Sequence, residues 1–196
     1  FYVEMGKNEA AEKMLIDFSK ILRKTLSSSE KMISLREERE TLLYYIDLQK
    51  ARYRDRFEVE FDMPENTLSC IVPDFILQPI VENAVYHGLR PCRTDGTIKI
   101  SAKEKNGCLL ICVSDDGGGI PDRLLADIRA SLSCTMSEKP ANIYGIKNVH
   151  DRLKLTYGCE YGLTIDSVPD EGTTVTLRIP FQPQKQKNKT LSMRKE

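Results

Sequence analysis

Several features that would direct the chain to a particular partner are missing from its sequence. It has no tryptophan, and no apolar run approaches the ~18–20 residues that a helix needs to span a bilayer. Basic and acidic residues number 29 each, so no net charge attracts nucleic acid or anionic lipid. We therefore expect a soluble globular protein that binds no nucleic acid. Because the sequence begins at Phe1 rather than Met and has no signal peptide, we also expect a fragment of a longer protein.

Metal–thiolate chemistry is also poorly supported. Six cysteines occur, but their spacing shows no metal-type pairing. The two that are four apart, Cys108 and Cys112, lie in an apolar run typical of a strand. The only histidines are His87 and His150. Reduced thiols in a cytosolic domain are the expected state.

The first part of the chain has the apolar spacing of two helices. Residues 8–26 carry an apolar stripe that includes Leu15 and Phe18. Ser34 and Glu37 have the spacing of a capping box, so a second helix is expected from there to about residue 56. The two helices predict a hairpin over residues 1–56. Its apolar stripe needs a partner, either a missing segment or a second chain.

From Phe57 the apolar period changes to two, which is typical of strands. Asn106-Gly107 predicts a tight hairpin, 169–172 predicts a second one, and 64–66 predicts a turn. The expected strands are 57–61, 97–103, 108–114, 163–168 and 173–179, and the expected helices are 79–87 and 144–157. Together they indicate an α+β fold, a two-layer α/β sandwich preceded by the α-helical hairpin. The sandwich is expected over 57–183, followed by a disordered tail at 184–196.

Two short motifs could bind a ligand near the middle of the chain. Asn83 and His87 are four apart and would share one helix face, from which an Asn can ligate Mg²⁺. Taken alone, Asn83 is better explained as a cap or a satisfied polar residue. The run from Asp115 to Ile120 places three glycines after a strand, which opens the backbone to close approach. Asp115 could accept a hydrogen bond from the exocyclic amine of a purine, and a flexible acidic turn is an equally good explanation.

Two further motifs lie nearer the C-terminus. In the third, Gly145 begins a helix, where exposed amides and the helix dipole attract anions. Lys147 or Arg152 could add positive charge for phosphates, although an exposed cation on a solvated face is the better explanation for each alone. The fourth, Gly172-Thr173, is by itself a hairpin turn.

The order of these four motifs resembles the Bergerat ATP-binding fold, which histidine kinases, DNA gyrase B, Hsp90 and MutL share. The run Pro73–Gly88 resembles the LytS-like branch of sensor histidine kinases in particular. Further segments similar to this branch are 35–38, 45–53, 145–153 and 171–173. The resemblance covers about residues 10–181.

The resemblance implies a role for each motif. Asn83 would hold Mg²⁺, Asp115 would bind the adenine amine of ATP, and residues 121–144 would form a mobile lid over the nucleotide. Glu82 and His87 would be the catalytic residues, with His87 close to the phosphates. The implied nucleotide-binding residues are Asn83, His87, Asp115, Gly117, Gly119, Ile120, Gly145, Lys147, Asn148, Gly172 and Thr173.

The sequence departs from the family pattern at three positions. Ile143 replaces the first glycine of the third motif, and Asp116 replaces the usual Asn after Asp115. Pro79 stands four residues before Asn83, where gyrase has a catalytic Glu. Glu82 is then the only adjacent base, which disfavours water activation and favours a kinase over a hydrolase.

The resemblance also implies a function for the intact protein. It would move the γ-phosphoryl group of ATP to a histidine and then to an aspartate of a response regulator. It would act as a homodimer held in the bacterial plasma membrane by a sensor region outside this cytoplasmic fragment. In this branch the acceptor histidine lies in an Asn-Pro-His-Phe segment, which these 196 residues lack, and neither His87 nor His150 is a suitable substitute. The hairpin at 1–56 would then be a remnant of the dimerisation and phosphotransfer region.

Two other classes stay open. One is a Bergerat-fold ATPase or protein-serine kinase. Sustained phosphate release by the fragment, or loss of that release in Glu82→Gln, would favour it. A nucleotide-gated interaction module would bind ATP without catalysis, and the substitution at Ile143 is the feature that suggests it.

Overall fold

The structure is a computed structural model that describes Gly6 and residues 8–26, 31–53, 56–88, 96–133 and 144–184. Its helices are α1 (Asn8–Leu26), α2 (Leu35–Tyr53), α3 (Glu65–Leu68), α4 (Gln78–Asn83), the π-helix η1 (Ala84–Gly88), α5 (Asp122–Ser133) and α6 (Tyr144–Tyr157). Its strands are β1 (Met32–Ser34), β2 (Phe57–Asp62), β3 (Ile71–Pro73), β4 (Gly96–Lys105), β5 (Cys108–Asp115), β6 (Gly162–Val168) and β7 (Gly172–Pro180). Within the described residues, no helix is long and apolar enough to cross a membrane.

A five-stranded sheet forms one layer of the fold, in the order β2-β4-β5-β7-β6. β2 runs parallel to β4, and the other neighbours are antiparallel. The turn between β4 and β5 uses the predicted pair, with Asn106 at φ 53° and Gly107 at φ 72°, as a tight hairpin of right-handed twist requires. Both predicted hairpins are therefore confirmed.

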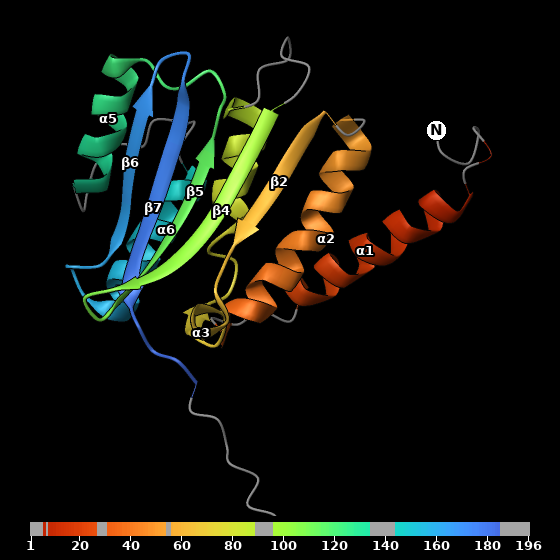
Figure 1. Cartoon of the computed structure of the whole chain (residues 1–196), viewed down its shortest axis with the longest axis horizontal. Coiled ribbons are helices and arrows are strands. Elements are labelled where there is room, and N and C mark those ends of the chain that lie inside the picture. The colour runs from red at the N-terminus through yellow and green to blue at the C-terminus, as the bar shows by residue number, and fades with distance from the viewer. Residues whose placement is uncertain are drawn as a thin grey trace, which may run out of the picture.

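Helices cover one face of this sheet, and the other face is polar. Along β5, Leu109, Ile111 and Val113 are buried, whereas Lys99 of β4 and Arg178 of β7 are exposed. In Figure 1, α6 and the α4–η1 helix lie behind the strands, and the opposite face of the sheet is turned to the viewer. This arrangement confirms the predicted α+β sandwich.

The two N-terminal helices form the predicted hairpin. The capping box at the start of α2 is present, because the N–H of Ser34 donates to Glu37 Oε2 at 2.8 Å and the N–H of Glu37 donates to Ser34 Oγ at 3.2 Å. On α1, Leu15 and Phe18 are 68% and 55% exposed, so these members of the predicted apolar stripe are left uncovered. The partner that would cover them stays a prediction.

Helix α2 packs into the same hydrophobic core as the sandwich. β1, just before α2, pairs antiparallel with β3, and Leu42 and Ile46 of α2 belong to one buried cluster with Ile80 of α4. The division at 56/57 therefore stays a prediction, and residues 31–53 are in close contact with the sandwich. The predicted tail lies outside the described residues except for Gln184, whose N–H donates to the carbonyl of Ser69 at 2.8 Å.

Two segments expected to be irregular are helical. The predicted turn at 64–66 leads into α3, because the carbonyl of Pro64 accepts from the N–H groups of Thr67 and Leu68. The first half of the predicted lid is α5, whose Leu125, Ile128 and Leu132 have helical spacing and are buried. The prediction missed this amphipathic stripe. The rest of the predicted lid, 134–143 with Ile143, lies outside the described residues.

Candidate functional site

The centre of the candidate site is Asp115, the last residue of β5. Its side chain is 8% exposed, and its Oδ1 accepts from the N–H of Gly117 at 3.0 Å. Thr173, its register partner on β7, also donates its backbone N–H to this carboxylate. Burial raises the pKa of Asp115 to about 6, against the opposing effect of these two N–H groups. A buried carboxylate at the end of a strand is a directed acceptor for a ligand N–H group.

Two glycines of the predicted motifs lie where no side chain fits. A Cβ on Gly119, at φ 63°, would stand 2.0 Å from the carbonyl oxygen of Val168. A Cβ on Gly172, at φ 123°, would stand 2.0 Å from the carbonyl oxygen of Asp115. The loop after β5 therefore presses directly against the β6–β7 hairpin. Gly117 is buried in the same loop, which brings the second and fourth motifs into one cluster.

Ser167 of β6 joins this cluster and was missed by the sequence analysis. Its Oγ accepts from the N–H of Ile120 at 2.8 Å and donates to the carbonyl of Gly172 at 2.8 Å. Thr173 Oγ1 lies 2.9 Å from the same hydroxyl. Ser167 therefore connects the end of the glycine loop, residues 116–120, to the fourth motif. Its register partner across the hairpin is Thr173, and that pairing is the signal that could have identified it.

The first and third motifs meet in a second cluster. Asn83, at the end of α4, donates Nδ2 to the carbonyl of Pro79 at 2.6 Å. A Cβ on Gly145 would lie 3.2 Å from Pro79 Cβ and 3.9 Å from Asn83 Nδ2, so α6 begins directly beside Asn83. Helix η1, which continues α4, contacts both β5 and β7. This contact places the second cluster on the helical side of the strands that carry Asp115 and Thr173.

The predicted shared face of Asn83 and His87 needs correction. The chain changes from α-helix to π-helix at Ala84, so the i, i+4 spacing of an α-helix does not hold between these two residues. The side chain of His87 lies outside the described residues. Its predicted catalytic and phosphate-side roles remain predictions.

Four other residues weighed in the sequence analysis make no contact with either cluster among the interactions described here. Lys147 is 5% exposed, and its Nζ donates to the carbonyl of Ser131 at 3.0 Å and to Asp151 Oδ1 at 3.2 Å, so it ties α6 to α5. The side chains of Glu82 and Asn148 are exposed. Arg152, weighed as a phosphate ligand, donates to the backbone carbonyl of Asp74 instead.

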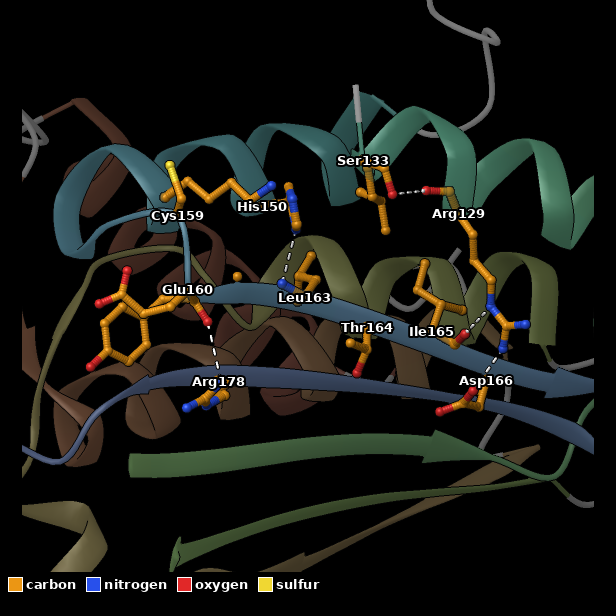
Figure 2. A pocket seen from close by; sticks show the side chains of 14 residues that line it. Arg129, Ser133, His150, Cys159, Glu160, Leu163, Thr164, Ile165, Asp166 and Arg178 are labelled. Atoms are coloured by element: carbon orange, nitrogen blue, oxygen red, sulfur yellow. Dashed lines mark hydrogen bonds and ion pairs between the residues drawn. The ribbon is translucent and has the colours of Figure 1, made fainter. Parts of the chain in front are cut away.

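A separate hollow of about 680 Å³ lies between α5, α6 and the edge strand β6 (Figure 2). His150 lies there, and its Nδ1 accepts from the N–H of Leu163 at 2.9 Å. Its side chain is 5% exposed, and its pKa is lowered by burial and by the charge of Lys154. Arg129 crosses the same edge to the carbonyl of Ile165. The expectation that His150 is no phosphoacceptor stays a prediction.

Comparisons with known proteins identify the family of the chain. The family described as "Histidine kinase-, DNA gyrase B-, and HSP90-like ATPase" matches residues 73–183, and the family "Histidine kinase" matches residues 1–57. Sensor histidine kinase YpdA of Escherichia coli (strain K12) is 33% identical over 175 residues, which are 89% of this chain and 29% of that protein. Sensor protein LytS of Staphylococcus epidermidis (strain ATCC 12228 / FDA PCI 1200) is 29% identical over 92% of this chain and 30% of its own length.

The fold is also that of a solved kinase domain. The catalytic domain of histidine kinase ThkA superposes with a TM-score of 0.54 at 20% identity, over 80% of this chain and 100% of that chain. The chain spans less than a third of the length of the curated relatives YpdA and LytS. The chain therefore belongs to the histidine kinase family, and residues 73–183 are the ATP-binding catalytic domain that this family shares with DNA gyrase B and HSP90.

Proposed function

We propose that the cluster around Asp115 holds the adenine of ATP and that the cluster around Asn83 holds its phosphates. The buried carboxylate of Asp115 carries the first assignment, because adenine offers an exocyclic amine as donor. Gly119 and Gly172 let the loop after β5 pack directly against the β6–β7 hairpin beside Asp115, and Ser167 and Thr173 hold the hairpin against that loop.

We propose Mg²⁺ as the cation that accompanies the phosphates. The described residues contain no cluster of three or more His, Cys, Asp or Glu that could hold a metal by itself. Mg²⁺ typically keeps several waters and takes one or two protein oxygens beside the phosphates, which fits a lone Asn. Because Nδ2 of Asn83 is turned back to Pro79, Oδ1 is the side-chain atom left for the ion. Mg²⁺ would supply charge neutralisation at the phosphates.

We propose that the whole protein transfers the γ-phosphoryl group of ATP to a histidine and then to an aspartate of a response regulator. The bond from the γ-phosphorus to the β-bridging oxygen of ADP breaks as a bond to an imidazole nitrogen forms, and the imidazole proton goes to solvent. The exposure of Glu82 and the proline at 79 favour this reaction over hydrolysis, since neither residue directs a buried base at a water. Homodimerisation and a membrane anchor outside this chain belong to the same proposal.

The whole protein with ATP labelled at the γ-phosphorus tests this function. We expect an acid-labile, base-stable label on the protein, which then moves to a response regulator. The 196-residue chain by itself should bind ATP without becoming labelled. Sustained release of inorganic phosphate with no protein label would contradict the kinase and support the ATPase alternative.

The raised pKa of Asp115 predicts a pH dependence of ATP binding. An adenine amine favours the ionised carboxylate. The affinity for ATP should therefore be highest above the folded pKa of Asp115, about 6, and should decrease as the pH falls through that value. We expect the affinity ratio between the parent chain and Asp115→Asn to shrink about tenfold between pH 7.5 and pH 5. The titration of ATP itself cancels in this ratio, because both chains bind the same ATP. The Asn variant has no ionisable group at position 115, so the ratio reports the ionisation of Asp115. An unchanged ratio would contradict the role of the carboxylate.

Asp115 also affects the stability of the fold without nucleotide, and this effect has the opposite pH dependence. The folded pKa of Asp115 is raised above 3.8, so the folded chain binds more protons than the unfolded one between pH 3.8 and about 6. The contribution of Asp115 to stability is therefore lost as the pH rises through this window.

A further inference from the structure

Helix α2 makes hydrogen bonds to the turn that precedes α4, the helix that ends at Asn83. Glu38 of α2 is 2% exposed, although it lies far from any predicted ligand contact in the sequence. Its Oε2 accepts from the N–H of Phe75 at 3.0 Å, and its Oε1 accepts from the N–H of Leu77 at 3.0 Å. Both oxygens of one buried carboxylate are therefore used to fix the turn in front of α4.

This turn is strained and is held from two sides. Phe75 has φ 52°, a left-handed conformation that is costly for a residue with a side chain. On the far side, Arg152 of α6 donates to the carbonyl of Asp74, and its guanidinium lies 3.8 Å from the carboxylate of Asp74. Such a conformation persists only when its surroundings determine it. Glu38 supplies the determining contacts from the side of α2.

A second contact joins α2 to the other end of the same helix. Arg52 of α2 donates Nη1 to the hydroxyl of Tyr86 in η1 at 2.6 Å, and its guanidinium lies 5.5 Å from the centre of the Tyr86 ring. The rings of Tyr53 and Tyr86 are edge to face at 6.3 Å. The α4–η1 helix is therefore attached to α2 before its first turn and again in its last, and Asn83 lies between the two attachments.

We infer that Glu38, assisted by Arg52, is a positioning residue that sets the place of Asn83 at the phosphates. This inference rests on the proposed function, because it gives Asn83 its role toward Mg²⁺. Two fixed points on one short helix leave it little freedom to rotate or shift against α2. Loss of the first point releases the strained turn, and Asn83 then moves relative to Asp115, which stays on β5. Glu38 should thus affect the Mg²⁺-dependent part of ATP binding and leave the adenine part unchanged.

The test compares ATP affinity with Mg²⁺ and with EDTA, and takes the ratio of the two as its readout. Glu38→Gln keeps the size of the side chain but turns one amide N–H₂ toward a backbone donor, so one of the two hydrogen bonds is lost. We expect this variant to lower the ratio about tenfold, toward the value of Asn83→Ala. Glu40→Gln, an exposed residue two positions along α2, is the matched control and should keep the parent ratio. A purely structural weakening would lower both affinities and leave the ratio unchanged.

A double variant completes the test. Glu38→Gln combined with Asn83→Ala should give the ratio of Asn83→Ala alone, since both changes act through one side chain. Independent addition of the two losses, or a parent-like ratio for Glu38→Gln beside a lowered ratio for Asn83→Ala, would overturn the inference and leave the proposed function standing. A parent-like ratio for Asn83→Ala would refute the proposed role of Asn83, and this inference with it. If Glu38→Gln does not fold, Arg52→Ala replaces it, and an unchanged ratio in that variant overturns the inference equally.

Discussion

Replacing Asp115 with alanine is expected to lower the affinity of the chain for ATP by about a hundredfold or more. The change removes the buried acceptor that we propose for the adenine amine, and it leaves the N–H groups of Gly117 and Thr173 without their carboxylate. The fold should survive, because Ala has no charge to desolvate and β5 keeps its ladder to β7. Calorimetric titration measures the affinity, and thermal unfolding verifies the fold.

The adjacent acid provides the control for this experiment. Asp116 is exposed, and its Oδ1 accepts from the N–H of Thr97 at 2.8 Å, so it continues the contact between β4 and β5. Asp116→Asn keeps that acceptor and removes one negative charge beside the site. We expect its ATP affinity to stay within about threefold of the parent. Equal losses in Asp115→Ala and Asp116→Asn would show that Asp115 has no special role.

Gly172→Ala is expected to disrupt both the fold near the site and nucleotide binding. Its Cβ would lie 2.0 Å from the carbonyl oxygen of Asp115, and a φ of 123° is strained for any residue with a side chain. The neighbouring atoms are backbone, so β5 and β7 must separate where Asp115 and Thr173 face each other. We expect a loss of about 3 kcal/mol or more in the free energy of unfolding, and no detectable ATP binding in the folded fraction.

Gly107→Ala is the control that separates the clash of a new Cβ with its neighbours from the cost of a positive φ. Gly107 has φ 72°, and a Cβ there would meet nothing within 4 Å. Its cost should be limited to about 1–2 kcal/mol for the left-handed conformation, with ATP affinity unchanged. Denaturant unfolding of both variants measures the difference. If Gly172→Ala loses no more stability than Gly107→Ala, the result would contradict the tight contact described between the loop after β5 and the β6–β7 hairpin.

Local signals made most of the fold predictable. The capping box at Ser34 and Glu37, the Asn106-Gly107 turn and the alternating strands depend on residues close in sequence, and all three are present in the structure. The pairing of β1 with β3 was not predicted, since three-residue strands carry almost no periodic signal and their partners are distant in sequence. Helix α5 was missed because the resemblance implied a mobile lid at 121–144, and the apolar spacing within that segment was not weighed.

The site was predictable in its backbone and less so in its side chains. Asp115, Gly119 and Gly172 were indicated by the order of the motifs and the family resemblance, since each motif alone was explained equally well as a turn, and the structure brings the three residues together. The direction of a long side chain depends on what packs beside it. Lys147 was assigned to the phosphates from its charge and the resemblance, whereas in the structure its ammonium donates to the carbonyl of Ser131 in α5, a helix that was not predicted. Glu38 could not be found from sequence, because its hydrogen-bond partners are 37 and 39 residues away.

The most direct test of the account is a calorimetric comparison of ATP with GTP, both with Mg²⁺, on the parent chain. Guanine carries a carbonyl oxygen where adenine carries the amine, so GTP would place an acceptor against the buried carboxylate of Asp115. We predict that ATP binds at one site per chain and that GTP binds at least about tenfold more weakly. Equal affinity for the two nucleotides, or no binding of ATP, would contradict the claim that Asp115 reads the adenine of ATP.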